Sequence, residues 1–164
     1  PKPMIDVIEE DPRWASLALG DLAERSGAAL FAHLKLPSES FDLALLACDA
    51  GRIAQLNEEF RGKDTPTNVL SWPSQERRPA EEGRAPVRPS PGELGDIAIA
   101  YDVCRAEAQA LGKPMSDHVC HLVVHGILHL LGYDHERPGD ADLMERIETE
   151  VLGNLGITDP YSDN

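Results

Sequence analysis

The stretch His118–His135 reads HVCHLVVHGILHLLGYDH and holds five of the six histidines in the chain. Ser116 can cap a helix at its start and Gly132 can end one, so we predict a helix from Ser116 to about Leu131. His125 and His129 are four residues apart. On a helix they share one face, with Cβ atoms about 5–6 Å apart. The spacing therefore places two imidazoles where both can reach one metal ion.

A third histidine can join this pair where the helix ends. A chain that turns near Gly132 can bring His135 back toward His125 and His129. Three neutral imidazoles and an open fourth position make up the arrangement of a catalytic zinc site. We predict one Zn²⁺ ion at this site, although nickel and other divalent ions also accept imidazole.

The other histidines are assigned different roles. His121 and His129 are eight residues apart, about 12 Å along a helix, so His121, His125 and His129 cannot all bind one ion. We interpret His121 as a partly buried residue or one that orients a ligand from behind. His118 and His33 are expected to be structural or surface residues, and Cys120 is expected to lie in the core.

The residue after the first expected ligand is Gly126. In H-E-x-x-H metalloproteases a glutamate at this position acts as the general base. Its absence argues against peptide hydrolysis. A zinc metallohydrolase or protease acting on another substrate stays an alternative.

Outside this stretch, strand and helix patterns are mixed along the chain. We predict strands at 4–8, 41–48, 68–72 and 94–100, and helices at 14–34, 53–60, 102–111 and after Pro138. The order lacks regular βαβ alternation, so it indicates an α+β fold, a small mixed sheet packed against helices.

Residues 74–92 differ from their surroundings because they are rich in proline, arginine and glutamate and nearly free of apolar residues. We predict a flexible loop or disordered insert. Its arginines could contact RNA, but a solvated linker is the favoured interpretation. These arginines are Arg77, Arg78, Arg84 and Arg88.

The composition is that of one globular domain spanning residues 1–164, with 41% hydrophobic and 27% charged residues. A net charge of −14 disfavours non-specific binding to nucleic-acid backbones but permits a locally basic cleft. The three cysteines include no C-x-x-C pair, which suggests reduced thiols. Neither an export signal nor an apolar run of eighteen residues is visible, so a cytoplasmic protein without a membrane partner is expected.

Three motifs together resemble the YbeY family of rRNA-maturation endoribonucleases. Residues 125–135, HGILHLLGYDH, are similar to the family motif H-G-x-L-H-L-x-G-Y-D-H throughout. Residues 56–71 contain Leu-Asn, Phe-Arg-Gly-Lys-Asp and Pro-Thr-Asn-Val-Leu-Ser in the family order, and residues 94–97 read Leu-Gly-Asp-Ile. Trp72 departs from the more usual phenylalanine, and the insert is longer than expected.

The resemblance implies a small α+β fold, a metal held by the three histidines, and single-strand-specific cleavage of RNA. It implies a role in ribosomal RNA processing, notably maturation of the small-subunit rRNA 3′ end, and in ribosome quality control. The expected partners are ribosomal RNA, the small ribosomal subunit and assembly factors, with no DNA. A non-enzymatic assembly factor whose metal only braces the fold is the remaining alternative.

Phosphodiester cleavage builds negative charge, which a zinc-type ion and a nearby cation can stabilise. Arg61 resembles the family's functional arginine, and its guanidinium suits phosphate, so we predict a catalytic and substrate-binding role. Lys63 is expected to guide the RNA backbone, and Arg52 and Lys113 could assist it. His125 is predicted to be catalytic as well as a ligand.

The general base is left open. Asp96, Asp134 or the 2′-OH of the substrate could activate the attacking oxygen, and Asp134 is better explained as a group that supports His135.

Overall fold

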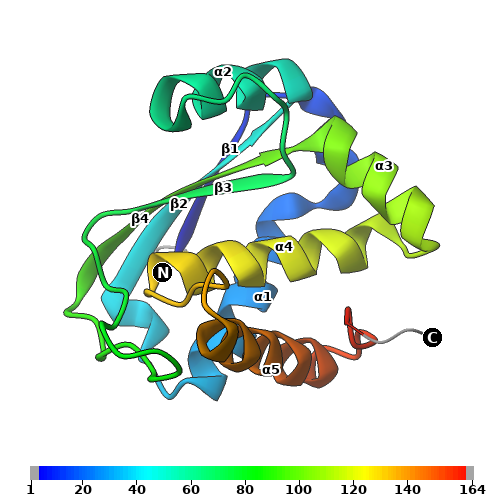
Figure 1. Cartoon of the computed structure of the whole chain (residues 1–164). Coiled ribbons are helices and arrows are strands. Elements are labelled where there is room, and N and C mark those ends of the chain that lie inside the picture. The colour runs from blue at the N-terminus through cyan, green and yellow to red at the C-terminus, as the bar shows by residue number, and fades with distance from the viewer. Residues whose placement is uncertain (1–3, 162–164) are drawn as a thin grey trace.

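The computed structural model describes residues 4–161 and contains a four-stranded mixed sheet (Figure 1). The strand order is β1-β2-β4-β3, with β1, β2 and β4 parallel and β3 antiparallel to β4. The strands are β1 (Ile5–Glu9), β2 (Phe41–Cys48), β3 (Val69–Pro73) and β4 (Gly92–Ala100). The predicted α+β class with a mixed sheet is confirmed. The ends of the predicted domain, residues 1–3 and 162–164, lie outside the described residues.

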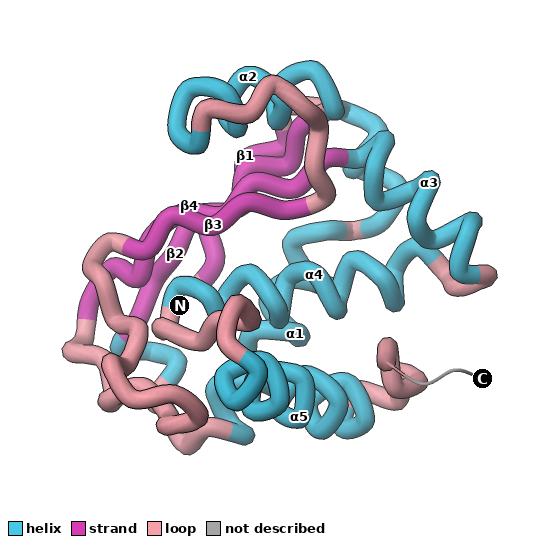
Figure 2. The backbone as a smooth tube through the Cα atoms, viewed as in Figure 1, coloured by secondary structure: helices cyan, strands magenta, loops and turns pink. Residues whose placement is uncertain are grey.

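Within residues 4–161, α2 covers one face of the sheet, and α1 and α4 cover the opposite face (Figure 2). Helix α5 packs against α4 and α1, outside that layer. The helices are α1 (Leu19–His33), α2 (Ala50–Arg61), α3 (Tyr101–Leu111), α4 (Met115–Leu130) and α5 (Pro138–Asn154). Among residues 4–161, the structure shows no helix with the length and apolar character needed to cross a membrane.

Alternation along the strands produces two hydrophobic clusters, one on each face of the sheet. Ile97 and Ile99 of β4 belong to the large cluster under α1 and α4, while Ala98 belongs to a small cluster under α2. Helix α4 lies between the sheet and α5, which explains why its sequence is apolar on most of its circumference. The histidine-bearing helix is therefore fixed by packing from both sides.

The predicted helix at 14–34 is wrong in its first part. Residues Pro12–Leu17 form a short 3-10 helix, and Ala18 has a left-handed φ of 48° before α1 begins. The break follows from the burial of Trp14, whose Nε1 donates to the carbonyl oxygen of Cys48 at 3.0 Å. Ser116 is also not the cap of α4, because Pro114 occupies that position and Ser116 lies in the first turn.

The segment 74–91 contains no helix or strand, whereas Gly92, the last residue of the predicted insert, is the first residue of β4. The segment is nevertheless bonded to the rest of the molecule rather than only to solvent. Arg77 donates to the carbonyl oxygens of Leu130 and Leu94 at 2.8 and 3.2 Å. The Gly83 amide donates to Asp140 of α5 at 2.8 Å. These contacts hold the segment across the ends of α4 and α5, and its flexibility stays a prediction.

Candidate metal centre

The structure brings His125, His129 and His135 together at the end of α4. Their ligand nitrogens all lie within 4.8 Å of one another. His125 and His129 come from successive turns of α4, and His135 follows a turn at Gly132, whose φ is 107°. The chain reversal expected from the sequence is therefore present.

The tautomer of His125 follows from its contact with Glu148 of α5. Its Nδ1 lies 3.0 Å from Oε1 of Glu148, and an ionised carboxylate can only accept. Burial would raise the pKa of Glu148, but hydrogen bonds from His121 and His125 outweigh it and lower the pKa to about 2. Nδ1 of His125 therefore carries the proton, and its Nε2 presents a lone pair to the other two histidines.

His129 is also suited to coordinate a metal. Burial, followed by the proximity of His125 and His135, lowers the pKa of His129 to about 4, so the ring is neutral at neutral pH. Its Nε2 lies 3.1 Å from Nε2 of His125. Two nitrogens bound tetrahedrally to one zinc ion are about 3.3 Å apart at ordinary bond lengths. The donor set thus fits a zinc-type ion.

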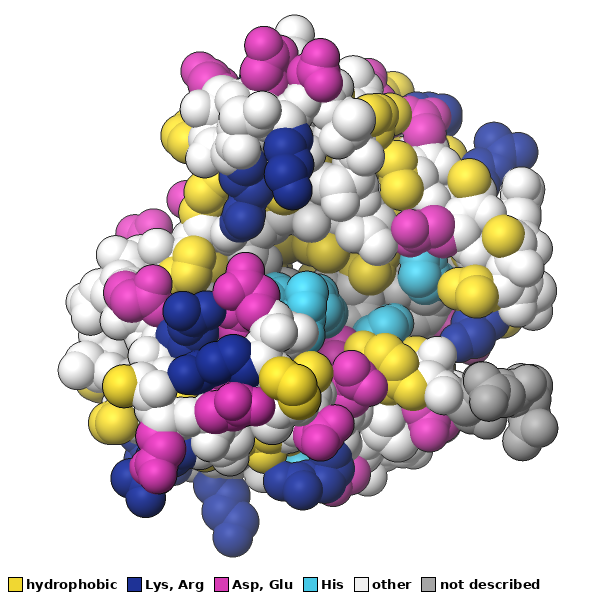
Figure 3. Space-filling model, in the orientation of Figure 1, with side chains coloured by type: hydrophobic (Ala, Val, Ile, Leu, Met, Phe, Trp, Pro, Cys, Tyr) yellow, Lys and Arg dark blue, Asp and Glu magenta, His cyan; other side chains and the backbone are white. Residues whose placement is uncertain are grey.

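The three histidines line a pocket of about 930 Å³, and Arg61 and Lys63 line the same pocket. Arg77 and Arg78 line its other side. Lys and Arg side chains accordingly gather on two sides of the hollow that exposes histidine (Figure 3). Glu76, Asp134 and Glu136 also line the pocket, and Arg78 pairs with the last two, so four cationic and three acidic side chains face this site in a chain with a net charge of −14.

Arg61 is held at the pocket by β3. Its Nη2 donates to the carbonyl oxygen of Ser71 at 2.9 Å, and Oγ of Ser71 donates to the carbonyl oxygen of Gly126 at 3.1 Å. Lys63 is exposed and follows Gly62, which ends α2 with a left-handed φ of 71°. Arg61 is thus tied through Ser71 to the helix turn that carries His125.

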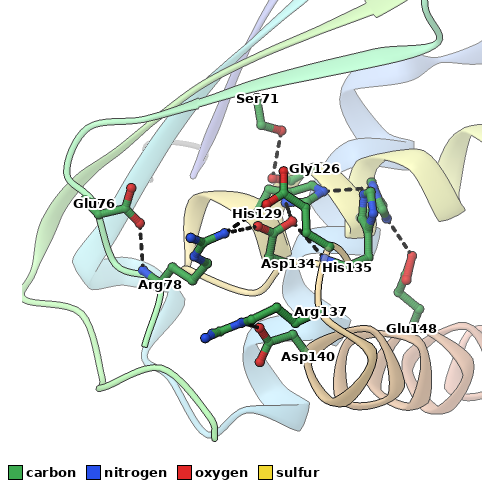
Figure 4. Close-up of polar contacts among 12 residues, drawn as sticks. Ser71, Glu76, Arg78, Gly126, His129, Asp134, His135, Arg137, Asp140 and Glu148 are labelled. Carbon is green, nitrogen blue, oxygen red and sulfur yellow. Dashed lines mark hydrogen bonds and ion pairs between the residues drawn. The ribbon is translucent and has the colours of Figure 1, made fainter. Parts of the chain in front are cut away.

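The structure places the other residues considered from the sequence either at the histidine pocket or away from it. Asp134 lines the pocket, where it accepts from the His135 amide at 2.8 Å and from Arg78 at 3.0 Å (Figure 4). Asp96 is exposed on β4 and is not one of the residues lining the pocket. Arg52 and Lys113 line other hollows of the surface. Of the two carboxylates, only Asp134 is placed to support the centre.

Gly126 faces the sheet. A Cβ atom at this position would lie 3.1 Å from Cδ1 of Ile97 and 3.3 Å from Oγ of Ser71. A glutamate here would be forced against β3 and β4. The close approach of α4 to the sheet therefore accounts for the missing protease glutamate.

His121 belongs to a second group, with His125 and Glu148, whose ligand atoms lie within 4.8 Å of one another and could hold a metal ion, so its assignment as a non-ligand stays a prediction. His121 is partly buried and its Nε2 lies 2.9 Å from Oε1 of Glu148, which also orients His125. His118 is buried beside Glu107, His33 pairs with Glu150, and Cys120 is in the core.

Glu148 was not identified from the sequence. It is fully buried, and it also accepts from the hydroxyl of Tyr161 at 2.8 Å. A signal was present, because Glu148 is four residues after Met144 and three before Val151 on the apolar stripe of α5. A carboxylate on the buried stripe of a helix requires partners, and the histidines of α4 provide them.

Comparison with known proteins places these features in a family. A family model described as Endoribonuclease YbeY matches residues 8–156. A protein of Ruegeria pomeroyi is 53% identical over 163 residues, covering 96% of this chain and 98% of its own. A Jannaschia protein is 51% identical, covering 96% and 99%. Both are named Endoribonuclease YbeY.

The fold is shared with a Thermotoga maritima protein whose structure was determined in solution. The TM-score is 0.57 at 23% identity, and the match covers 97% of this chain and 99% of that one. The family match begins near the end of β1, at residue 8, and extends over the other three strands, the histidine cluster and the arginine-bearing helix α2. The chain described here belongs to the endoribonuclease YbeY family.

Proposed function

We propose that this protein is a metal-dependent endoribonuclease that cleaves single-stranded RNA during ribosomal RNA processing in the cytoplasm. Maturation of the small-subunit rRNA 3′ end and ribosome quality control are the proposed settings. The observation that carries the proposal is the convergence of three histidine nitrogens in one pocket with Arg61 and Lys63, in a chain of this family.

His125, His129 and His135 would hold the ion, for which Zn²⁺ suits the ligands and nickel is an alternative. The ion would supply a concentrated positive charge beside the scissile phosphate. Glu148 would keep the lone pair of His125 directed at the ion, since it fixes the Nδ1 proton.

Arg61 would bind and stabilise the phosphate as charge develops on its oxygens. One of its five N–H groups is used by the Ser71 carbonyl, so the others remain for phosphate oxygens. Lys63 would contact a neighbouring phosphate from the same wall of the pocket. These cations would draw the RNA backbone to one place on an otherwise acidic molecule.

The proposed partners are ribosomal RNA, the small ribosomal subunit and assembly factors, with no DNA. The attacking oxygen would come from water or from the 2′-OH of the substrate. Asp134 is already engaged by the His135 amide and Arg78, which favours an orienting role for it.

The test is cleavage of a single-stranded small-subunit rRNA precursor fragment by the purified protein. We expect cleavage to stop with a chelator and in His129→Ala, which should also lose bound metal by elemental analysis. Arg61→Ala should keep the metal and lose about 10²–10³-fold in rate, the usual effect of removing one transition-state donor. The RNA end groups would distinguish attack by water from attack by the 2′-OH.

Arg52→Ala is the matched control, because Arg52 is also on α2 but lies outside the histidine pocket. It should cleave at the wild-type rate. Unchanged cleavage by Arg61→Ala would remove the role given to Arg61. Cleavage that survives both the chelator and His129→Ala would contradict a metal-dependent reaction.

A further inference from the structure

A second pocket of about 420 Å³ adjoins the metal centre on the side of α3. The two pockets share Asn68, Val69 and His125 as lining residues. A molecule bound along the first pocket can therefore extend a group into the second without leaving the surface beside His125.

The two pockets differ in charge. The first is lined by four cationic side chains, Arg61, Lys63, Arg77 and Arg78, and by three carboxylates, Glu76, Asp134 and Glu136, two of which pair with Arg78. Within the described part of the chain, residues 4–161, no lysine or arginine lines the second, and Glu107 contributes a carboxylate. A phosphate would be repelled there, whereas it is attracted by the first pocket. The occupant that fits the second pocket is an uncharged part of the nucleotide.

The walls of the second pocket suit a flat aromatic group. Val69, Leu111 and Leu122 supply apolar surface, and Leu111 is 57% exposed at its edge. The rings of His121 and Tyr161 also line it, with centroids 5.6 Å apart. Unpaired bases stack on His and Tyr rings, and a carboxylate accepts from their exocyclic amino groups.

These walls are held in place before any ligand binds. Glu148 lies 2.9 Å from Nε2 of His121 and accepts from the Tyr161 hydroxyl at 2.8 Å. Glu107 is bonded to Nε2 of His118 and to Nδ2 of Asn68, at 2.9 and 3.1 Å. A pocket whose side chains are already oriented loses little freedom on binding.

We propose that this second pocket receives one unpaired nucleobase next to the cleaved phosphodiester bond. The inference rests on the proposed ribonuclease function and adds a base-binding subsite to it. A base can reach the pocket only when it is free of pairing and stacking, so the subsite would select single-stranded RNA.

The experiment uses a single-stranded RNA oligonucleotide that the wild-type protein cleaves at one bond. Each nucleotide in turn is replaced by an abasic residue, which keeps the phosphate and removes the base. We expect one position beside the cleaved bond to lower the rate by at least about fivefold, the effect of the weakest base–aromatic stacking, and the other positions to have little effect.

Two tryptophan variants on α3 then test whether the loss of rate with the abasic RNA arises in the second pocket. Ala110 is exposed and lines the second pocket, so Ala110→Trp should fill it and make the intact and abasic RNAs equally slow. Gln109 is exposed and does not line the pocket, so Gln109→Trp should keep the wild-type rate and the wild-type difference. Far-UV circular dichroism would verify that both variants are folded.

If the wild-type protein cleaved every abasic RNA at the same rate as the intact RNA, the base-binding subsite would be overturned and the ribonuclease function would stand. A wild-type difference preserved in Ala110→Trp would also overturn the subsite. Absence of all cleavage with added zinc would instead contradict the proposed function. In that case the subsite is tested by binding, with 2-aminopurine placed at each position of the RNA in turn. The wild-type protein should quench the 2-aminopurine fluorescence at one position, and Ala110→Trp should not.

Discussion

Glu148 shows how one buried residue organises the metal centre. Its side chain is inaccessible to solvent, and burial would raise its pKa, but hydrogen bonds from His121 and His125 lower that pKa and keep the carboxylate ionised. The Tyr161 hydroxyl donates to its other oxygen. The same carboxylate fixes the proton on His125 and positions the rings that form the wall of the second pocket. Removing its charge should therefore affect metal binding before it affects the fold.

We predict that Glu148→Gln lowers the affinity for Zn²⁺ about 10–100-fold, the usual effect of losing the partner of a metal-ligating histidine. The amide is a weaker acceptor, and it no longer fixes the His125 tautomer. Competition with a chromophoric chelator measures the affinity, and thermal melting of the metal-free protein shows whether the fold has changed.

Glu150→Gln is the matched control, because Glu150 is on the same helix and pairs with His33, away from the pocket. Its zinc affinity should stay within twofold of wild type. If Glu148→Gln also bound zinc with wild-type affinity, Glu148 would have no part in orienting His125.

Helix α4 and the segment 74–91 meet at Gly132. A Cβ atom on Gly132 would lie 2.5 Å from the Arg77 carbonyl oxygen, and the residue has a φ of 107°. Only glycine fits both the backbone conformation and the close approach. The turn that delivers His135 therefore depends on contact with a segment more than fifty residues earlier in the chain.

Gly132→Ala should destabilise the protein by at least about 2 kcal/mol, from the positive φ and from overpacking against Arg77. For a chain of this size that is a decrease of roughly 4–8 °C in Tm. Gly20→Ala is the control, because nothing lies within 4 Å of a Cβ there. Equal melting of the two variants would show that the 74–91 segment does not pack against this turn.

At the scale of the whole molecule, the hydrophobic core joins the sheet to α1, α4 and α5 through contacts between apolar side chains, none of which requires a metal ion. A chain of this length can bury an adequate core without a metal. The fold is therefore expected to persist when the site is empty.

Chelation should leave the far-UV circular dichroism unchanged and preserve a cooperative thermal transition. Added Zn²⁺ should raise the stability by about 2.7 kcal/mol at a free concentration 100 times the Kd, through binding to the folded state alone. Loss of the transition on chelation would instead support the alternative in which the metal braces the fold.

Much of the secondary structure could be predicted from local patterns. The strand Phe41–Cys48 has the predicted bounds, and α4 ends within one residue of the predicted Leu131. The H-x3-H-x5-H spacing with Gly132 indicated which histidines would converge, because helix geometry and a glycine turn are local properties. The split at Ala18 was missed, because burial of Trp14 against Cys48 is a long-range effect.

The sequence by itself determined the elements, the histidine triplet and the family motifs, all of which depend on residues near one another in the chain. Only the tertiary structure decided that Arg61 enters the same pocket, that Glu148 orients His125, and that a second pocket adjoins the first. Arg61 and His125 line one pocket although they are 64 residues apart in the chain, and Glu148 contacts His125 across 23 residues. These contacts exist because α4 packs between the sheet and α5, and local patterns carry no information about which distant side chains that packing brings together.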